Sequence, residues 1–448
     1  MNWKSFLALL KEHYQLSGVL IGAFLVAVST GTYTNWDAQL EFEAATSVVT
    51  RGFPFVINGL MINQPPLGFY MDAPVFHVFG LSYANGVGLA TAFGLGAVVL
   101  VYVLGTMLYG KRTGLMAAAL FGIVPWHVYM SKIFLIDNQN LFFSLLFLAA
   151  GVLAVRKNSQ KLLAVAGVFF AVAFLTKLFA VFMLVPFLLI IFLQRKQLEF
   201  KITLRNILIF LAPTFVLQAV WFGGFANQNF FGVYLASDIT HPVLVTNPSL
   251  LFLPIILVKS VGWFLFVAGL FSLVLSVFYR KIFTKILWLD AVCVGTIAVI
   301  AGLNLLLVFG FHLTVPYVSV FKYNYLALPF YCLIAASLAA KSDLLIGSVD
   351  WKKKTHFIKP LLVGVGLVLV LASLLESTTF LTKWVGFVAF GVDSVTYYPF
   401  NVFSGAANGF SPALTYVALV LMVLILAVPF LVSVLRGAYR WFSKVLSS

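Results

Sequence analysis

The stretch that decides the fold follows the first hydrophobic span and reads Asn35-Trp36-Asp37-Ala38-Gln39-Leu40-Glu41-Phe42-Glu43. It holds three of the 13 acidic residues of the chain within seven positions. Carboxylates are scarce at a membrane face and usually have a function there. The stretch therefore predicts a polar loop outside the membrane that carries chemistry. The same loop continues through Gln64-Pro65-Pro66-Leu67.

The composition indicates a protein that is embedded in lipid. Apolar residues make up 62% of the 448 residues and charged residues only 9%, whereas a soluble domain has about a quarter charged residues. The net charge is +15, but the basic residues lie in short loops between apolar spans. They therefore favour membrane orientation and contact with anionic lipid headgroups over nucleic-acid binding. Cys293 and Cys332 lie inside apolar spans, which predicts buried packing residues and no disulfide.

The apolar spans predict an all-α polytopic membrane protein, with residues 1–448 forming a single domain. A helix needs about 20 apolar residues to cross the hydrocarbon core. Twelve segments qualify, the fifth and sixth being short and joined at Lys177. The expected spans are 16–34, 84–107, 113–131, 138–155, 161–177, 179–194, 206–224, 251–278, 287–311, 318–340, 357–376 and 412–435.

Every second loop is basic, as Lys111 and Arg112 illustrate between the second and third spans. This pattern predicts that both termini are cytoplasmic. The first outer loop, 35–83, is long enough to have structure of its own, and residues 37–51 predict an amphipathic surface helix. The residues expected on its apolar face are Leu40, Ala44, Ser47 and Val48. The other expected outer loops are 132–137, 225–250, 312–317 and 377–411.

Asp37 and Asp137 are the candidate catalytic residues. Asp137 begins the fourth span at the outer face, so the two carboxylates could flank one cleft. One could act as a general base for an incoming hydroxyl, and the other could orient a substrate or bind a metal. The alternative is that each caps a helix, where a negative charge also suits the helix dipole. Glu41 lies one turn after Asp37 on the same face of the surface helix.

The chemistry of these residues does not require a cofactor. Two carboxylates with no His at ligand spacing favour a solvated helix face over a metal site, and a divalent metal is the open alternative. The chain has no phosphate-binding glycine loop, nucleophile elbow or zinc spacing. An activated substrate is therefore expected to arrive through the lipid, and no nucleotide site is expected.

Five basic residues on the outer side break the charge pattern: Arg51, Lys132, Lys259, Lys322 and Lys383. Lys259 lies inside the eighth expected span and Lys322 opens the tenth. A charge at that depth usually has a partner or lines a wet cavity, and a lipid phosphate would suit both. The alternative for these lysines is that the side chain extends to the lipid headgroups and needs no special site; this interpretation fits Lys383 best. His127 is either a hydrogen-bonded structural residue or part of a site. Trp36 is either an interfacial anchor or a substrate-stacking residue.

Several motifs resemble the polytopic glycosyltransferases of the protein O-mannosyltransferase and aminoarabinose transferase type. These motifs are Asp37 after the first helix, Gln64-Pro65-Pro66-Leu67 in the same loop, Leu135-Ile136-Asp137, Leu175-Thr176-Lys177, and Lys322-Tyr323-Asn324-Tyr325-Leu326-Ala327-Leu328-Pro329. The resemblance covers residues 15–335. It implies the GT-C fold and transfer of a sugar, such as a mannose-like hexose, from a polyprenyl-phosphate carrier to an extracytoplasmic hydroxyl on a protein, lipid or glycan.

The resemblance also implies roles for individual residues. Asp37 matches the catalytic acid, Asp137 the second acidic position, and Lys322 the cation near the donor phosphate. Gln64 departs from the Lys that the family often has there. A charge-assisted contact is worth about 1.5–3 kcal/mol, so either Lys322 or Lys259 compensates for the missing Lys or the donor differs. The donor-binding residues would be Lys322, Lys259, Gln64 and Tyr325, and the acceptor or supporting residues would be Glu41, Trp36, His127 and Lys132.

Two other functions are compatible with twelve spans. A secondary transporter would carry its charges near the membrane midplane, on broken helices of two similar halves. The clustering of acids at the outer face favours the transferase instead. A protein that binds a lipid carrier without catalysis is the third possibility, which the departure at Gln64 leaves open.

Overall fold

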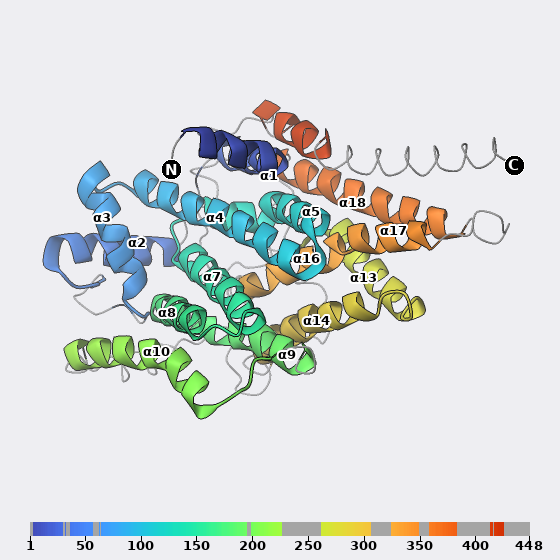
Figure 1. The fold of residues 1–448 in the computed structure, drawn as a ribbon. Helices are drawn as coiled ribbons and strands as arrows, with labels where there is room; N and C mark the ends of the chain where they lie inside the picture. The colour runs from blue at the N-terminus through green and yellow to red at the C-terminus, as the bar shows by residue number, and fades with distance from the viewer. Residues whose placement is uncertain are drawn as a thin grey trace, which may run out of the picture.

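The computed structural model describes residues 3–29, 36–56, 64–194, 199–225, 261–305, 324–348, 358–382 and 416–424, together with a few single positions. The described part is almost entirely helical, as Figure 1 shows. Its helices through the first half are α1 Trp3–Ser29, α2 Trp36–Arg51, α3 Leu67–Phe79, α4 Tyr83–Tyr109, α5 Lys111–Ile123, α6 Pro125–Ser131, α7 Asp137–Arg156, α8 Gln160–Thr176, η2 Leu178–Met183, α9 Leu184–Gln194 and α10 Leu204–Phe225. Then follow α13 Trp263–Phe278, α14 Thr284–Leu305, η5 Tyr325–Ala327, α16 Leu328–Ala336, α17 Leu338–Gly347 and α18 Ile358–Thr382.

The helices confirm an all-α, multi-pass membrane protein. Within the described ranges, six helices are long and apolar enough to cross a membrane, or seven if one bent pair is a single span. The expected count of twelve remains a prediction, because the expected spans 251–278, 318–340 and 412–435 lie partly outside these ranges. Most of the expected outer loop 377–411 also lies outside them. Cys293 and Cys332 are buried free thiols, as expected.

The expected span 113–131 is broken near its end. The chain forms α5 and α6 instead, and the two helices meet at an angle of 64°. Pro125 is the first residue of α6, and Val124 before it has an extended ψ of 125°. A proline disfavours the helical conformation at the residue before it, so α5 ends here. The bend directs α6 toward the start of α7.

A second interruption falls at Lys177, where the fifth and sixth expected spans meet. Lys177 has φ −159° and ψ 133°, an extended backbone between α8 and the 3-10 helix η2. Its side chain is buried. The extended residue therefore lets the chain change direction and places an ammonium group inside the bundle.

Glycines allow the central helices to approach closely. A Cβ on Gly105 of α4 would lie 2.6 Å from the Cα of Gly114 of α5. A Cβ on Gly167 of α8 would lie 2.2 Å from the carbonyl oxygen of Phe210 on α10. Small residues at helix contacts are typical of membrane bundles, in which van der Waals packing drives association.

Gly167→Ala is expected to destabilise the protein by about 1–3 kcal/mol, because the added methyl group meets the backbone of α10 and forces the two helices apart. Gly88→Ala on α4 is the matched control, since a Cβ there meets nothing within 4 Å. The control should be neutral or stabilising by up to about 1 kcal/mol. Thermal unfolding in detergent measures both changes. Equal melting temperatures for the two variants would contradict the assigned packing.

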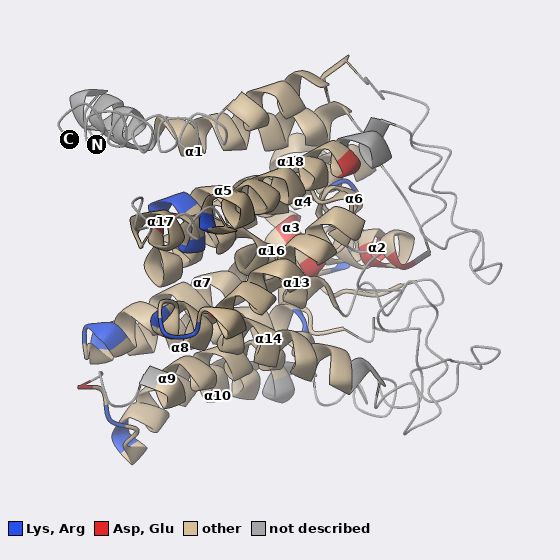
Figure 2. Cartoon of the chain, turned by 90° about the vertical axis from the view of Figure 1, so that its right-hand side faces the viewer, with Lys and Arg blue, Asp and Glu red and all other residues tan. Residues whose placement is uncertain are grey.

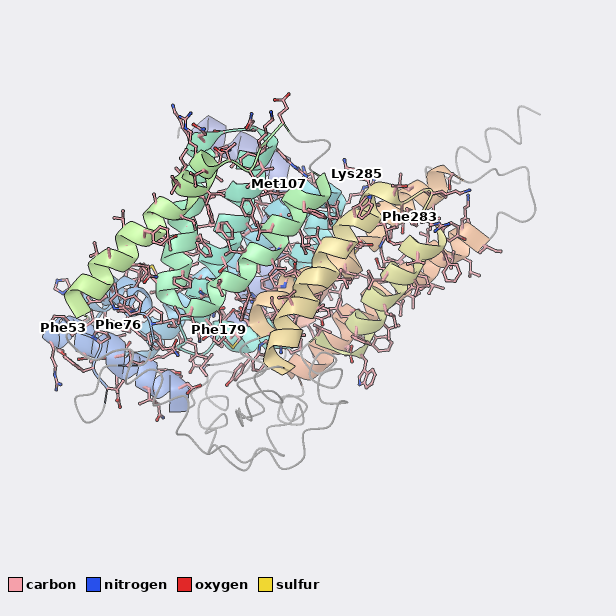
Figure 3. The ribbon with its side chains drawn as sticks, turned by 90° about the horizontal axis from the view of Figure 1, so that it is seen from below. Phe53, Phe76, Met107, Phe179, Phe283 and Lys285 are labelled. Carbon is pink, nitrogen blue, oxygen red and sulfur yellow. The ribbon has the colours of Figure 1, made fainter. Side chains whose placement is uncertain are left out.

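The two ends of the bundle carry opposite charges. In Figure 2 most positions coloured for Lys and Arg lie toward the ends of α8, α10 and α17, whereas most of those coloured for Asp and Glu lie toward the opposite end, around α2, α3 and the end of α18. Figure 3 places Phe53, Phe76 and Phe179 toward one end, and Met107 and Lys285 toward the other. We call the end at which α2 and α3 lie the acidic end.

The first loop forms helices that pack on the acidic end. The expected amphipathic helix 37–51 is confirmed as α2, and it buries the expected residues Ala44, Ser47 and Val48. Phe42 on α2 makes edge contacts with Phe76 of α3 and Phe134, with ring centroids 5.6 and 5.7 Å apart. This aromatic cluster fixes α2 and α3 against the segment that leads into α7.

A buried ion pair joins the helices of the second half. Lys341, which the charge pattern suggests lies in a basic loop, is instead fully buried in α17, and its Nζ lies 2.7 Å from Asp290 Oδ2 on α14. The ammonium also donates to the carbonyl and hydroxyl oxygens of Ser272 and to the Ser337 hydroxyl. A charge in an apolar interior needs such partners, so this network holds α13, α14 and α17 together.

Candidate functional site

The candidate site is built on the first turn of α7, which begins with four consecutive polar residues. All four side chains of Asp137, Asn138, Gln139 and Asn140 are buried. Burying a polar group without a hydrogen bond is costly. Each of the four has a partner outside α7, and these partners come from α3, α6, η5 and the end of α8, so this turn is the point at which the acidic end is assembled.

Asp137 forms a buried ion pair, and its Oδ2 lies 2.7 Å from Lys177 Nζ. Asn140 in the same turn also contacts the Lys177 segment, because its amide donates to the carbonyls of Ala173 and Lys177 at 2.8 and 3.0 Å. The alternative that Asp137 caps the helix is wrong in detail. The N-cap is Ile136 with no side-chain cap bond, and Asp137 is the first helical residue, where its charge still suits the dipole.

Asn138 connects α7 to His127 and Tyr325, two of the residues that the sequence singles out. The Tyr325 hydroxyl donates to the side-chain oxygen of Asn138 at 2.6 Å and lies 2.7 Å from His127 Nδ1. The Asn138 amide donates to the Met130 carbonyl at 2.5 Å. Tyr325 and His127 are both buried. In this arrangement they hold the start of α7 in place, and His127 is a hydrogen-bonded buried residue.

Glu41 brings α2 to the same turn. Its carboxylate is buried and accepts a hydrogen bond from the Ile136 backbone N–H at 2.8 Å. This N–H belongs to the residue directly before Asp137. Asp37 lies four residues before Glu41 on α2, about 6 Å along the helix axis, and is half-buried. The structure therefore brings the two candidate catalytic residues to one region, Asp37 through α2 and Asp137 through α7.

Sequence reasoning missed a further carboxylate in this region. Asp72 of α3 is buried, and its Oδ1 accepts a hydrogen bond from Gln139 Nε2 at 2.5 Å. Burial raises the pKa of Asp72 well above its ordinary value; the hydrogen bond from Gln139 opposes this shift, and the nearby Glu41 charge adds to it. One signal was available: Asp72 is the only acid in the apolar helix that follows Pro65-Pro66.

The other predicted site residues are placed as follows. Gln64 is half-buried directly before Pro65 and Pro66, which are buried and lead into α3. Lys132 lies half-buried in the turn after α6, and burial lowers the pKa of its ammonium group. Lys259, Lys322 and the side chain of Trp36 lie outside the described residues. Among described side chains, no group of three or more His, Cys, Asp or Glu residues could hold a metal ion.

Comparison with protein families identifies the region that contains this site. Residues 63–221 match the family described as dolichyl-phosphate-mannose-protein mannosyltransferase. The matched segment contains Gln64, Asp72, His127, Asp137 and Lys177. A comparison with curated proteins found no match.

Solved structures share the fold over most of the chain. ArnT from Cupriavidus metallidurans in the apo state is 13% identical, with a TM-score of 0.55 and coverage of 94% of this chain and 77% of that chain. The same protein bound to undecaprenyl phosphate is 15% identical, with a TM-score of 0.53 and coverage of 92% and 78%. The archaeal oligosaccharyltransferase AglB from Archaeoglobus fulgidus, in complex with an inhibitory peptide and a dolichol-phosphate, is 13% identical, with a TM-score of 0.53.

The similarity to AglB covers 86% of this chain but only 56% of AglB, so this chain spans about half the length of that protein. At these identities the likeness establishes the fold. The chain has the GT-C fold expected from its motifs. The family match and the fold together favour a glycosyltransferase over the transporter alternative.

Proposed function

We propose that this chain, a membrane glycosyltransferase of the GT-C fold, transfers a mannose-like hexose from a polyprenyl-phosphate carrier to an extracytoplasmic hydroxyl. The acceptor belongs to a protein, lipid or glycan. One observation carries the proposal: Glu41, one turn from Asp37, contacts the residue next to Asp137, within the GT-C fold. Two of the similar structures hold undecaprenyl phosphate or dolichol-phosphate, which supports a donor of this class.

The two aspartates suit different tasks. Asp137 is buried and paired with Lys177, so its charge is already compensated, and it serves to orient the site. Asp37 is half-buried at the first turn of α2, where a carboxylate can reach an acceptor from outside. We assign Asp37 as the general base, which removes the proton of the acceptor hydroxyl as its oxygen bonds to the anomeric carbon. The carrier phosphate leaves with the electron pair of the broken bond.

The leaving phosphate needs cations. We propose Lys322, and also Lys259, for this contact, with Gln64 as a neutral hydrogen-bond donor near the phosphate. Lys322 precedes Tyr325 by three residues, and this covalent connection keeps the two Cα atoms within about 11 Å. Tyr325 itself is bonded to Asn138. Lys132, in the turn before α7, and Trp36, at the start of α2, are proposed to support acceptor binding.

The basic loops support an orientation in which both termini are cytoplasmic, so that the acidic end faces the extracytoplasmic side. A divalent metal is not required by this scheme. Whether turnover survives a chelator tests this point directly.

A donor assay tests the function. Purified protein is incubated with polyprenyl-phosphate-mannose, with the glucose analogue, and with other sugar donors. Release of free polyprenyl phosphate is then measured with and without acceptor. Release from at least one donor is the expected result. Tight binding of the donor without release would instead support a lipid-carrier binding protein.

Lys322→Met is expected to raise the KM for the lipid donor by about 10–150-fold, the equivalent of a charge-assisted contact worth about 1.5–3 kcal/mol. The matched control is Lys157→Met, because Lys157 is an exposed lysine after α7, at the end away from Asp137. Initial rates over a range of donor concentrations give KM and kcat for both variants. An unchanged KM for Lys322→Met would remove Lys322 from the phosphate contact.

A further inference from the structure

The contact between Asp72 and Gln139 has one hydrogen bond and leaves one oxygen of each side chain without a partner. Gln139 Nε2 donates to Asp72 Oδ1. The other carboxylate oxygen, Asp72 Oδ2, has no hydrogen-bond partner, and neither has Gln139 Oε1. The two orphan atoms therefore belong to the same two side chains. Both are acceptors, and both side chains are at most 3% exposed.

An ionised carboxylate is a poor fit to these surroundings. Among the described residues no Lys or Arg forms an ion pair with Asp72. The buried ammonium of Lys177 is paired with Asp137 instead. Burial raises the pKa of the Asp72 carboxyl most, and the Glu41 charge raises it as well, so that the pKa lies well above its ordinary value although the hydrogen bond from Gln139 lowers it. A buried charge without a partner usually neutralises itself by a pKa shift.

One added proton would give both unpartnered oxygens a hydrogen bond. A carboxylic acid has one O–H donor in addition to its acceptor oxygen. A proton on Asp72 Oδ2 provides the donor that Gln139 Oε1 lacks, while Oδ1 continues to accept from Nε2. The acid and the amide then form two hydrogen bonds, and both orphan atoms are satisfied.

We propose that Asp72 is a neutral, proton-carrying positioning residue, which fastens the first-loop helix α3 to the first turn of α7 through a two-bond acid–amide pair with Gln139. Gln139 follows Asp137 by two residues, and α3 begins directly after Gln64-Pro65-Pro66. The pair therefore fixes the proline stretch relative to the buried Asp137–Lys177 ion pair. Loss of the proton would weaken this attachment, so the acidic end loosens at high pH. The effect that this inference predicts on turnover rests on the proposed transferase function.

The surroundings of Asp72 determine how the pH dependence is read. α3 packs against α2, α4 and α8, and its Asp72 contacts α7. The titratable groups that these elements carry near the acidic end are Asp37, Glu41, Glu43 and Arg51 on α2, Asp137 on α7, Lys177 after α8, Tyr83 on α4, and Tyr70 and His77 on α3 itself. A pH effect is assigned to Asp72 only if it disappears in a variant that changes this residue alone.

Asp72→Asn is the decisive variant. Its amide can accept from Gln139 Nε2 and donate to Gln139 Oε1, so it reproduces the neutral acid without a titratable proton. We expect Asp72→Asn to keep the wild-type melting temperature at neutral pH, and to keep kcat and KM within about 3-fold, consistent with retention of both hydrogen bonds. Asp72→Leu has the same branching at Cγ but no polar atoms. We expect it to lose most turnover, because Gln139 is left buried without partners.

The pH dependence of unfolding provides a readout that needs no substrate. The pKa of Asp72 is raised in the folded protein. Its stabilising effect is therefore fully present below the unfolded value and is lost as the pH rises through the folded value. Between the unfolded and the folded pKa of Asp72, the wild-type folding equilibrium constant should fall by about tenfold per pH unit more than that of Asp72→Asn. The infrared carbonyl band of a protonated carboxylic acid should also be present in the wild type and absent in Asp72→Asn.

Two results would overturn the inference. One is the same pH slope and the same carboxylic-acid band in the wild type and Asp72→Asn, which would show that Asp72 is ionised. The other is loss of turnover in Asp72→Asn with normal folding, which would make Asp72 a charged catalytic or metal-binding group. Neither the slope nor the band depends on the donor. Failure of the transferase assay is thus distinguishable from failure of this inference.

Discussion

Asp37→Asn is expected to lower kcat for sugar transfer by about 10²–10⁴-fold, the typical contribution of general-base catalysis. The substitution keeps the size of the side chain but removes its ability to take a proton from the acceptor hydroxyl. The donor KM should change little, because the donor phosphate is bound by cations elsewhere. Release of polyprenyl phosphate in the presence of acceptor measures the effect.

Glu43→Gln is the control for Asp37→Asn. It removes one negative charge from the same helix, two residues after Glu41, at a half-buried position. If both variants lose activity equally, the loss reflects the net charge of α2, and Asp37 has no special role. If Asp37→Asn retains full turnover with an unchanged melting temperature, the assignment of the base is wrong.

Lys177→Met is expected to destabilise the protein by about 3–5 kcal/mol, because it leaves the buried Asp137 carboxylate without its ion-pair partner. The pair has a 2.7 Å N–O distance, and the Lys177 and Asp137 side chains are only 3% and 6% exposed. Removing one charge from such a pair costs more than removing both. The double variant Asp137→Asn with Lys177→Met should therefore recover much of the lost stability. Unfolding by denaturant in detergent measures all three proteins.

Lys161→Met controls for the loss of a lysine near α8, which Lys177 follows directly. Lys161 is exposed at the first turn of the same helix, and its substitution should leave the melting temperature unchanged. A Lys177→Met variant as stable as the wild type would show that the ion pair contributes nothing. A double variant less stable than Lys177→Met would show that Asp137 has other essential partners.

The sequence identifies site residues only where a charged side chain stands out from its apolar surroundings. Asp37, Asp137 and Lys177 attract notice because charges are rare in this chain. Asp72 is also the only acid in its helix, but nothing in the sequence connects it to its partner, Gln139, which is 67 residues away. The run Asp137-Asn138-Gln139-Asn140 is visible in the sequence, but its partners come from α3, α6, η5 and the end of α8. No local pattern encodes them.

The sequence by itself determined the membrane location, the helical class, the amphipathic helix over 37–51 and the motifs that resemble the GT-C glycosyltransferases. These follow from composition and periodicity, because lipid requires every backbone polar group to be satisfied within a helix. Only the tertiary structure decided the bend at Pro125, the pairing of Asp137 with Lys177, and the contacts of Glu41 and Asp72 with α7. The reason is that a buried polar group selects whichever partner the packed helices bring within reach, however far away it lies along the chain.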